Sequence, residues 1–501
     1  MLEIALAQLR FATSLLLGTP FSLRSLEQIV STLKETRQEF GPLASPKDDL
    51  SGGGPVLDEE TRQAMQLRRF RSQARKAAQE TGYYRDLFEH LDLDLRRLSF
   101  EAITRVPLLQ KDTLRANPDA FVCRTAQPFL RALTTGTTGK PTSIAFSSHE
   151  MRVYFALEAI GTLFSGDLEP DDIVQISTSS RGTLGNICAA GAYAHIGAMC
   201  YLAGVVEPAQ ALALLTERRH IAGKKSRTSI LSTYPSYLGE LVECGLRLGY
   251  QPTDFGLERI YVGGEVVTQG LKRRCQQLFG PVRCLDSGYG MTEIWPFGGR
   301  LCEAGHLHFE VSQGLLEVLH LETGLACQAG EIGTMVATPF PPYRETTLLL
   351  RYNTQDVVQV PAQPPTCSLR HLPATSPILG KRSLSLHHDH GWTFPRHIME
   401  ALEALEEVPL PARYSYRAVP GGVALDVVTR TKSSLVFHTI ENSLHEHGVP
   451  VQQLRLMRDP QQLSHAYPLR CDLREHTFPA SPADEIVMQE MDLSVSQVEK
   501  R

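Results

Sequence analysis

Residues 133–141 read Leu-Thr-Thr-Gly-Thr-Thr-Gly-Lys-Pro, a run of small hydroxyl residues and glycines that closes with a lysine and a proline. Glycine lets backbone N–H groups approach a polyphosphate closely, and threonine hydroxyls add further hydrogen-bond donors. A Walker A loop needs four residues between its first glycine and its Gly-Lys pair, whereas two residues separate Gly136 from Gly139 here. The run therefore predicts a phosphate-binding loop of another type, with a polar hairpin turn as the structural alternative.

Three further motifs lie at or near the ends of predicted strands. In residues 262–265 (Val-Gly-Gly-Glu), the glycines leave room for a flat ligand against the backbone. Residues 287–293 (Ser-Gly-Tyr-Gly-Met-Thr-Glu) offer a ring that can stack on a purine, a hydroxyl for a phosphate and a carboxylate for Mg²⁺. Residues 350–356 (Leu-Arg-Tyr-Asn-Thr-Gln-Asp) end in a carboxylate that can accept both hydroxyls of a ribose. The structural alternatives are surface turns for the first two motifs and an Arg–Asp pair for the third.

Hydrophobic periodicity predicts the elements that position these motifs. Apolar runs at residues 173–177, 229–233, 257–262 and 282–285 read as strands, and helical patterns such as residues 208–220 separate them. Strands that alternate with helices indicate right-handed βαβ units and a mostly parallel sheet. Ligands bind beyond the carboxyl ends of such strands, which is where the glycine-rich motifs lie.

The chain also divides into parts of different composition. Residues 45–57 are rich in Ser, Gly, Pro and Asp and indicate a linker behind a helical head. Beyond about residue 380, a helix (395–406), two alternating strands, a second helix and a further strand predict a small α+β domain. The predicted parts are a helical extension with its linker at 1–60, a large domain at 61–380, a small mobile domain at 381–480 and a disordered tail at 481–501.

Composition excludes several classes of protein. The 50 Lys and Arg residues against 55 Asp and Glu give a net charge of −5, which argues against a nucleic-acid binder because phosphate neutralisation needs a positive surplus. No apolar run approaches the roughly 20 residues of a membrane span, and Glu3 and Arg10 indicate an amphipathic N-terminal helix rather than a signal peptide. The ten cysteines form no CxxC pair and predict reduced thiols in a cytoplasmic protein.

A helix predicted at residues 62–80 carries basic residues around an apolar stripe. We expect a solvated basic face, with an anion-binding site as the alternative. The basic residues are Arg68, Arg69, Arg71, Arg75 and Lys76.

In their order and separation, the four motifs resemble the adenylate-forming superfamily of acyl-CoA synthetases, peptide-synthetase adenylation domains and luciferases. Residues 83–88, 106–114 and 391–395 narrow the resemblance to the phenylacetate–CoA ligase-like branch, and it covers roughly residues 65–478. It implies an α/β fold: a large N-terminal body with mixed and parallel sheets, plus a small α+β C-terminal lid. It also implies that ATP and Mg²⁺ convert a small carboxylic acid into an acyl-adenylate, whose acyl group passes to coenzyme A, an acyl-carrier-protein thiol or an amine.

The resemblance assigns roles to individual residues. Thr292 would touch the α-phosphate, Glu293 would hold Mg²⁺, and Asp356 would bind the ribose. Tyr234 and Trp295 would line the acid pocket, where an aromatic or otherwise planar acid is expected. The other residues implied in nucleotide binding are Thr134, Thr135, Gly136, Thr137, Thr138, Gly139 and Lys140 at the phosphates, and Gly264, Glu265, Tyr289, Gly290 and Met291 around the adenine.

Two departures from the family pattern stand out. The hinge, which the family writes as roughly Gly-Arg-x-Asp, reads Gly-Lys-Arg-Ser at residues 380–383, so that Lys381 or Arg382 fills the basic position and the acidic residue is missing. The catalytic lysine near the end of the family's C-terminal domain is also missing, since no lysine lies between Lys432 and Lys500. Losing a positioned cation costs several kcal/mol of transition-state stabilisation.

Three alternatives follow from the missing lysine. Arg470 or Arg474 stands in for it, or the enzyme works slowly or in one half-reaction, or the chain is a catalytically weakened homologue that binds a nucleotide or acyl-adenylate without turnover.

A metal site and a homodimer are two further hypotheses from the sequence. Cys302, His308 and Cys367, with His306 as a substitute, offer ligands for Zn²⁺ against the alternative of ordinary surface residues. The histidine run at residues 387–390 reads as a solvated hinge loop. The helical head offers an interface for a homodimer.

Overall fold

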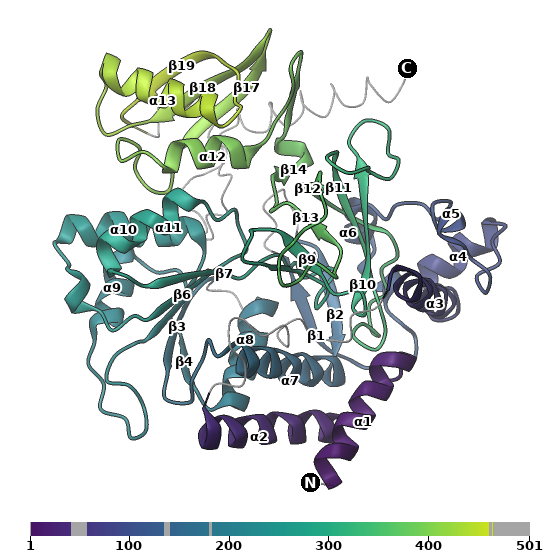
Figure 1. Ribbon diagram of the computed structural model, residues 1–501. Coiled ribbons are helices and arrows are strands. Elements are labelled where there is room, and N and C mark those ends of the chain that lie inside the picture. The colour runs from purple at the N-terminus through teal and green to yellow at the C-terminus, as the bar shows by residue number, and fades with distance from the viewer. Residues whose placement is uncertain (1, 42–57, 135–140, 180–182, 460–462, 464–501) are drawn as a thin grey trace.

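A large body carries a smaller C-terminal domain at one end, and the two N-terminal helices lie at the opposite end (Figure 1). The computed structural model describes residues 2–41, 58–134, 141–179, 183–459 and 463. The predictions for residues 135–140 of the phosphate loop, for Arg470 and Arg474 and for the tail at 481–501 lie outside the described residues.

The N-terminal helices are fixed by polar caps and by packing on the body. Ser22 caps the second helix, which packs on both the first helix and α7. Thr81 ends α3 and its hydroxyl caps α4, so that one residue sets the angle between them. These helices are α1 (Leu2–Leu17), α2 (Leu23–Phe40), α3 (Glu59–Glu80), α4 (Gly82–His90), α5 (Phe100–Ile103) and α6 (Lys111–Ala116).

A five-stranded parallel sheet in the order β4-β3-β5-β6-β7 forms one half of the body. Its side chains alternate between two cores, since Ile230 packs with α7 and α8 while Leu231 packs with α9, α10 and α11. Helices on both faces bury such a sheet fully. The strands are β3 (Ile173–Ser177), β4 (Met199–Leu202), β5 (Ile230–Thr233), β6 (Arg259–Val262) and β7 (Arg283–Asp286), and the helices are α7 (Ser148–Ser165), α8 (Leu184–Ile196), α9 (Pro208–Thr216), α10 (Pro235–Leu248) and α11 (Gln269–Phe279).

Antiparallel sheets form the other half of the body. One has the order β10-β11-β12-β14, a second has the order β13-β9-β8, and β1 and β2 pair on either side of the phosphate loop. The strands are β1 (Pro128–Leu133), β2 (Ser143–Ser147), β8 (Gly299–Leu301), β9 (Leu307–Phe309), β10 (Gly314–His320), β11 (Ile332–Pro339), β12 (Tyr352–Gln359), β13 (Ala374–Thr375) and β14 (Gly380–Lys381).

The small C-terminal domain has its own hydrophobic core around Ile398, Val427 and Ile440. It rests on α11, where the buried Thr268 donates its hydroxyl to the fully buried Glu403. The elements after the hinge are β15 (Leu386–His388), β16 (Gly391–Thr393), α12 (Pro395–Glu403), β17 (Tyr414–Val419), β18 (Gly422–Val428), α13 (Ser434–Glu446) and β19 (Val451–Met457).

The structure confirms the expected fold class, with corrections at element ends. The strand predicted at 173–177 coincides with β3. The helix predicted at 208–220 ends at Thr216, because Arg219 leaves the helix to lie over the Tyr201 ring and to bond Ser226 O through its backbone N–H. The helix predicted at 395–406 ends at Glu403. Among the described residues, every helix is too short or too polar to cross a bilayer.

The basic face expected on α3 is only partly solvated. Arg69 is buried and donates to the backbone oxygens of Ser312 and Pro341, so it ties the helix to the body.

Candidate active site

Three predicted residues meet at Asp356 on β12. Tyr289 donates its phenol O–H to Asp356 Oδ2 at 2.8 Å, and Lys381 Nζ lies 2.8 Å from Oδ1. Antiparallel pairing of β12 with β14 puts Asp356 opposite Lys381, whose Nζ also donates to Thr354 O at 3.1 Å. Burial, and next the neighbouring Asp356 carboxylate, raise the pKa of Tyr289 well above its ordinary value. Tyr289 therefore stays protonated and orients the Asp356 carboxylate.

A second group centres on Glu293, which is 1% exposed. Tyr352 donates its O–H to Glu293 Oε1 at 3.1 Å, and Lys111 Nζ lies 3.3 Å from the same oxygen. Lys111 starts α6, and the loop before it is bonded to β12 through Leu109 N to Arg351 O at 3.0 Å. A buried carboxylate needs such a compensating charge, and Lys111 supplies it beside the motif at 287–293.

Aromatic rings press against the two glycine-rich loops. A Cβ on Gly264, whose φ is +83°, would lie 2.9 Å from Tyr234 Cε1, so a larger residue would push the ring away. A Cβ on Gly290 would lie 3.1 Å from Trp295 Cζ3. Trp295 Nε1 is buried and has no hydrogen-bond partner among the described residues. A flat aromatic ring thus lies against each of the loops after β6 and β7.

Glu265 and Thr134 each make hydrogen bonds that fix the position of their own loop. Glu265 accepts hydrogen bonds from the backbone N–H and the hydroxyl of Ser236 at 2.9 and 3.0 Å, which ties the loop after β6 to the start of α10. Thr134 Oγ1 accepts from Thr142 N at 2.9 Å and closes the base of the phosphate loop. The remaining predicted loop residues, Thr135, Gly136, Thr137, Thr138, Gly139 and Lys140, lie outside the described residues.

The structure separates the two candidates for the hinge cation. Lys381 reaches Asp356, whereas the Arg382 guanidinium lies 4.1 Å from the centre of the Trp392 ring. Thr292 lies half-buried beside Glu293, and Met291 Sδ accepts a second contact from the Tyr289 hydroxyl at 3.3 Å. The side chain of Lys381, and not that of Arg382, therefore belongs to the described site.

The candidate zinc ligands converge away from Asp356. Ligand atoms of Cys302, His306, His308 and Cys367 all lie within 4.8 Å of one another. Cys367 Sγ is 3.2 Å from His308 Nε2, and Cys302 Sγ is 3.7 Å from His306 Nδ1. Tetrahedral zinc with bonds of about 2.0–2.3 Å separates its sulfur and nitrogen ligands by roughly 3.5 Å, so this donor set fits the ion.

The surroundings of His308 also suit a metal ligand. Burial lowers the pKa of the His308 imidazole, which favours the neutral form. Its Nδ1 lies 3.3 Å from Leu372 O, which leaves Nε2 facing Cys367. His306 was held only as a substitute ligand in the sequence-based interpretation, because spacing alone does not show that the β8–β9 turn brings it back to Cys302.

Comparisons with known proteins complete the description of the site. No protein-family model matches the sequence. The phenylacetate–coenzyme A ligase of Thermus thermophilus is 25% identical over 367 residues, which cover 70% of this chain and 78% of that enzyme. The phenylacetate–coenzyme A ligase of Pseudomonas putida is 25% identical over 302 residues, 59% of this chain and 66% of that enzyme. A crystal structure of 2-hydroxyisobutyryl-CoA ligase in the postadenylation state, 17% identical, superposes with a TM-score of 0.67 over 87% of this chain and 93% of that one.

The chain is therefore similar in sequence to phenylacetate–coenzyme A ligases and similar in fold to a 2-hydroxyisobutyryl-CoA ligase. Lys111 is the residue at the site that motif-based reasoning left without a role. It lies far from Glu293 in the chain, and its one sequence signal is a lysine at the start of a helix.

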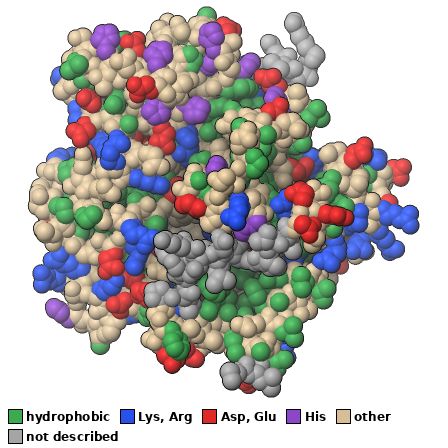
Figure 2. All heavy atoms as spheres, in the orientation of Figure 1, with side chains coloured by type: hydrophobic (Ala, Val, Ile, Leu, Met, Phe, Trp, Pro, Cys, Tyr) green, Lys and Arg blue, Asp and Glu red, His purple; other side chains and the backbone are tan. Residues whose placement is uncertain are grey.

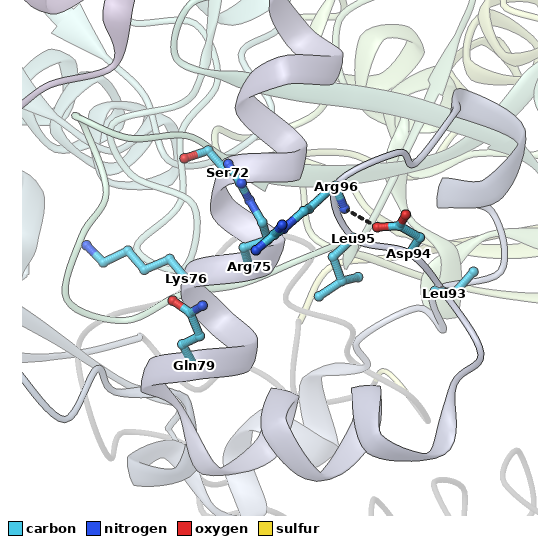
Figure 3. Close-up of a pocket in the computed structure, with 8 residues that line it drawn as sticks. All are labelled: Ser72, Arg75, Lys76, Gln79, Leu93, Asp94, Leu95 and Arg96. Atoms are coloured by element: carbon cyan, nitrogen blue, oxygen red, sulfur yellow. Dashed lines mark hydrogen bonds between the residues drawn. The ribbon is translucent and has the colours of Figure 1, made fainter.

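The pocket on α3 lies apart from these residues. It has a volume of about 480 Å³ between α3 and the segment after α4, and Figure 3 shows the cationic side chains of Arg75, Lys76 and Arg96 around it. Asp94 accepts from the backbone N–H of Arg96 at 2.9 Å. Arg75 and Arg96 are solvent-exposed, in agreement with the solvated face expected for this part of α3.

Proposed function

We propose that this protein activates a small, planar carboxylic acid with ATP and Mg²⁺ to an acyl-adenylate and passes the acyl group to coenzyme A. The observation that carries the proposal is the convergence of Tyr289, Asp356 and Lys381 in one contact beside the Glu293–Lys111 pair. Tyr289 and Glu293 follow the parallel strand β7, Asp356 and Lys381 come from the antiparallel strands β12 and β14, and Lys111 comes from α6. Together these residues supply a ribose acceptor, a metal-binding carboxylate and two cations.

Each side chain has a distinct task in the proposed reaction. Asp356, oriented by Tyr289, accepts the ribose hydroxyls, and Thr292 contacts the α-phosphate. Glu293 holds Mg²⁺, which neutralises phosphate charge when bound. Attack on the α-phosphate needs alignment and charge compensation more than an acid–base pair, and the residues of the site are suited to that need.

The position of Lys111 supports the proposal that the reaction proceeds although the chain lacks the family's C-terminal lysine. Its side chain is 19% exposed and its ammonium group lies on a nearly buried carboxylate. We propose that it takes the place of the lysine that the chain lacks between Lys432 and Lys500. A cation held in a partly dry site stabilises developing charge more strongly than one in water.

We propose that Tyr234 and Trp295 form walls of the acid pocket. Two rings packed on glycines make flat apolar surfaces, which favour a planar or aromatic acid.

Pyrophosphate release with a panel of aromatic and aliphatic acids tests adenylation. We expect release that depends on ATP and on an aromatic acid, and formation of the acyl-CoA when coenzyme A is added. Pyrophosphate release without formation of an acyl-CoA would instead indicate a carrier-protein thiol or an amine as the acceptor. Nucleotide binding without release for any acid would favour the second candidate, the catalytically weakened binding homologue, which the missing lysine motivates.

We also propose that the four-ligand cluster binds a structural Zn²⁺. Elemental analysis of protein washed with a weak chelator is expected to give about one zinc per chain. A value well below one equivalent would overturn the zinc site without affecting the proposed ligase function. We further propose a boundary between a large domain (61–380) and a small mobile domain (381–480), and a cytoplasmic location for a protein whose described cysteines are all free thiols.

A further inference from the structure

A groove lined by cations lies on the outer surface of the body, between α3 and the segment that follows α4 (Figure 3). Its volume is about 480 Å³, within the range of roughly 300–1,000 Å³ that pockets for small molecules have. Arg75 and Lys76 line the groove from α3. Arg96 lines it from the opposite wall, with its side chain extended across the groove toward Arg75 (Figure 3). The groove therefore gathers three positive charges in a space large enough for a small molecule.

The two arginines of the groove lack carboxylate partners. In the part of the chain that the structure describes, neither Arg75 nor Arg96 forms a salt bridge. Arg75 Nε donates to the uncharged carbonyl of Arg71 at 3.3 Å. Asp94, a carboxylate of the lining, accepts from the backbone N–H of Arg96 at 2.9 Å and lies 3.9 Å from Arg97 Nε. Two like charges that share a groove repel each other, so an anion between them removes an unfavourable interaction.

Neutral groups complete the lining. Ser72 and Gln79 lie on the same face of α3 as the cations, about one turn before them and one turn after them. Both side chains are exposed, and their hydroxyl and amide groups can donate to phosphate oxygens. Leu93 and Leu95, which are partly buried in the opposite wall, supply an apolar surface. The lining thus combines charged donors, neutral donors and an apolar wall, as small-molecule sites do.

Both walls of the groove are fixed in place. The buried side chains of Phe70, Ala74 and Ala77 hold α3 on the body. Arg71 Nε donates to Leu98 O at 2.8 Å and so joins α3 to the opposite wall, where Leu98 is itself buried. The groove therefore keeps its width without a ligand, and binding requires little further ordering of the chain.

The groove lies in a basic part of an acidic chain. Residues 59–133, from α3 through β1, hold 14 of the 50 Lys and Arg residues but 10 of the 55 Asp and Glu residues. Figure 2 shows Lys and Arg side chains gathered at the edge of the molecule where α4 and α5 lie. Burial raises the pKa of Glu345, and the nearby charge of Lys76 opposes this rise, so Lys76 serves both that carboxyl and the rim of the groove. A local positive field raises the concentration of anions near the groove.

We propose that this groove binds a small molecule through a diphosphate group, with Arg75 and Arg96 on its oxygens and the neutral donors of α3 beside them. The planar fork of a guanidinium group matches two oxygens of a phosphate, and two such forks match the charge of a diphosphate. Inorganic pyrophosphate and nucleoside diphosphates both present this group. Within the described residues, none of the lining side chains contacts Asp356 or Glu293, so the inference is independent of the proposed ligase reaction.

Chemical protection tests the groove one arginine at a time. Phenylglyoxal modifies accessible guanidinium groups, and peptide mass spectrometry of the full chain reports each arginine separately. We expect inorganic pyrophosphate, or adenosine diphosphate in a parallel series, to protect Arg75 and Arg96. Arg97 is the internal control, because it is 89% exposed directly after Arg96 but does not line the groove, and it is expected to react at the same rate with and without the ligand. Protection by pyrophosphate alone would identify a free anion as the ligand, and protection by adenosine diphosphate alone would identify a nucleotide.

Variants of the full chain provide the second test. In Arg96→Ala, the ligand concentration that half-protects Arg75 is expected to rise roughly tenfold, because a charge-assisted hydrogen-bonding group is lost. Arg96→Lys is expected to show a smaller rise, since it keeps the charge without the fork. Arg97→Ala is the matched control and is expected to leave the half-protecting concentration unchanged, with equal melting temperatures showing that all three variants fold.

Two results would overturn the proposal. One is modification of Arg75 and Arg96 at rates that neither ligand changes. The other is equal protection of Arg97, or an equal effect of Arg97→Ala and Arg96→Ala, which would show a diffuse attraction of anions to the basic surface and no site in the groove.

Discussion

At the scale of single residues, the site depends on carboxylates that are oriented by neighbours from distant parts of the chain. Asp356 is held by Tyr289 on one oxygen and by Lys381 on the other. Glu293 is held by Tyr352 and Lys111. Substitution of the four residues that orient these carboxylates is expected to distinguish effects on nucleotide binding from effects on turnover.

Replacing Lys111 tests the compensating cation. Lys111→Ala is expected to lower kcat for pyrophosphate release on the order of 10²–10³-fold, as loss of one positioned electrostatic partner does, with a smaller change in KM for ATP. Lys111→Arg is expected to restore part of the rate because it keeps the charge but not its point geometry. Lys432, an exposed lysine in the loop between β18 and α13, provides the control Lys432→Ala. An unchanged kcat for Lys111→Ala would exclude the proposed role.

Replacing Tyr289 tests the orientation of Asp356. Tyr289→Phe keeps the ring and removes the O–H that donates to Asp356, and a hydrogen bond to a charged group contributes about 1.5–3 kcal/mol. We expect KM for ATP to rise roughly tenfold with a smaller loss in kcat. Because burial raises the pKa of the phenol, this residue is expected to add no ionisation to the pH profile of the parent enzyme below pH 10. Equal KM values for the two proteins would contradict the contact.

At the scale of elements, the cysteine–histidine cluster joins two segments that share little regular structure. Cys302 and His308 belong to the β8–β9 hairpin, and Cys367 precedes β13, which pairs with β9. Short strands of two or three residues provide few ladder hydrogen bonds, so a metal ion that binds both segments would replace the missing pairing.

Removal of the metal tests this link. Cys367→Ser, or dialysis against a strong chelator, is expected to lower the melting temperature by several degrees and to reduce the zinc content below one equivalent. Cys327→Ser is the matched control, because that free thiol lies outside the cluster on the same half of the body. A Cys367→Ser protein that keeps its zinc and its melting temperature would overturn the site.

Sequence patterns predicted the elements better than the contacts between them. The strand at 173–177 and the glycine motifs at strand ends could be predicted because each depends on residues close together in the chain. The Glu293–Lys111 pair, the return of His306 toward Cys302 and the burial of Arg69 could not, because each is created by tertiary packing. The ends of α9 and α12 were placed too late for the same reason, since side chains of other elements take up the backbone groups there.

At the scale of the whole molecule, the body and the small domain meet at a closely fitted contact between α11 and α12. A Cβ on Gly270 would lie 2.4 Å from the backbone C and O of Glu403 and 2.6 Å from Ala404 N. Backbone atoms cannot turn aside as a side-chain tip can, so this glycine sets the approach of the two domains. Arg274 adds to the contact by donating to Leu405 O and Val408 O at 3.0 and 2.8 Å.

Gly270→Ala is expected to loosen the small domain from the body. Overpacking of a tight contact costs about 1–3 kcal/mol, so we expect faster proteolysis near the hinge and an increased radius of gyration in small-angle scattering. Gly161→Ala is the control, because no atom lies within 4 Å of a Cβ at that position of α7, and it is expected to leave both measurements unchanged. Equal proteolysis of the two variants would show that this contact does not hold the domain.

The Asp356–Lys381 ion pair links the candidate site to the predicted hinge. Lys381 ends β14 at the second residue of the predicted hinge (380–383), and its ammonium group lies 2.8 Å from one oxygen of the carboxylate proposed to receive the ribose. The ribose of a bound nucleotide and Lys381 of the proposed hinge would therefore use the same carboxylate, that of Asp356. By thermodynamic reciprocity, if nucleotide binding changes the equilibrium between two hinge positions by some factor, the change of hinge position alters the nucleotide affinity by the same factor. In the proposed reaction, release of the nucleotide is therefore expected to be coupled to rotation of the small domain through this one carboxylate.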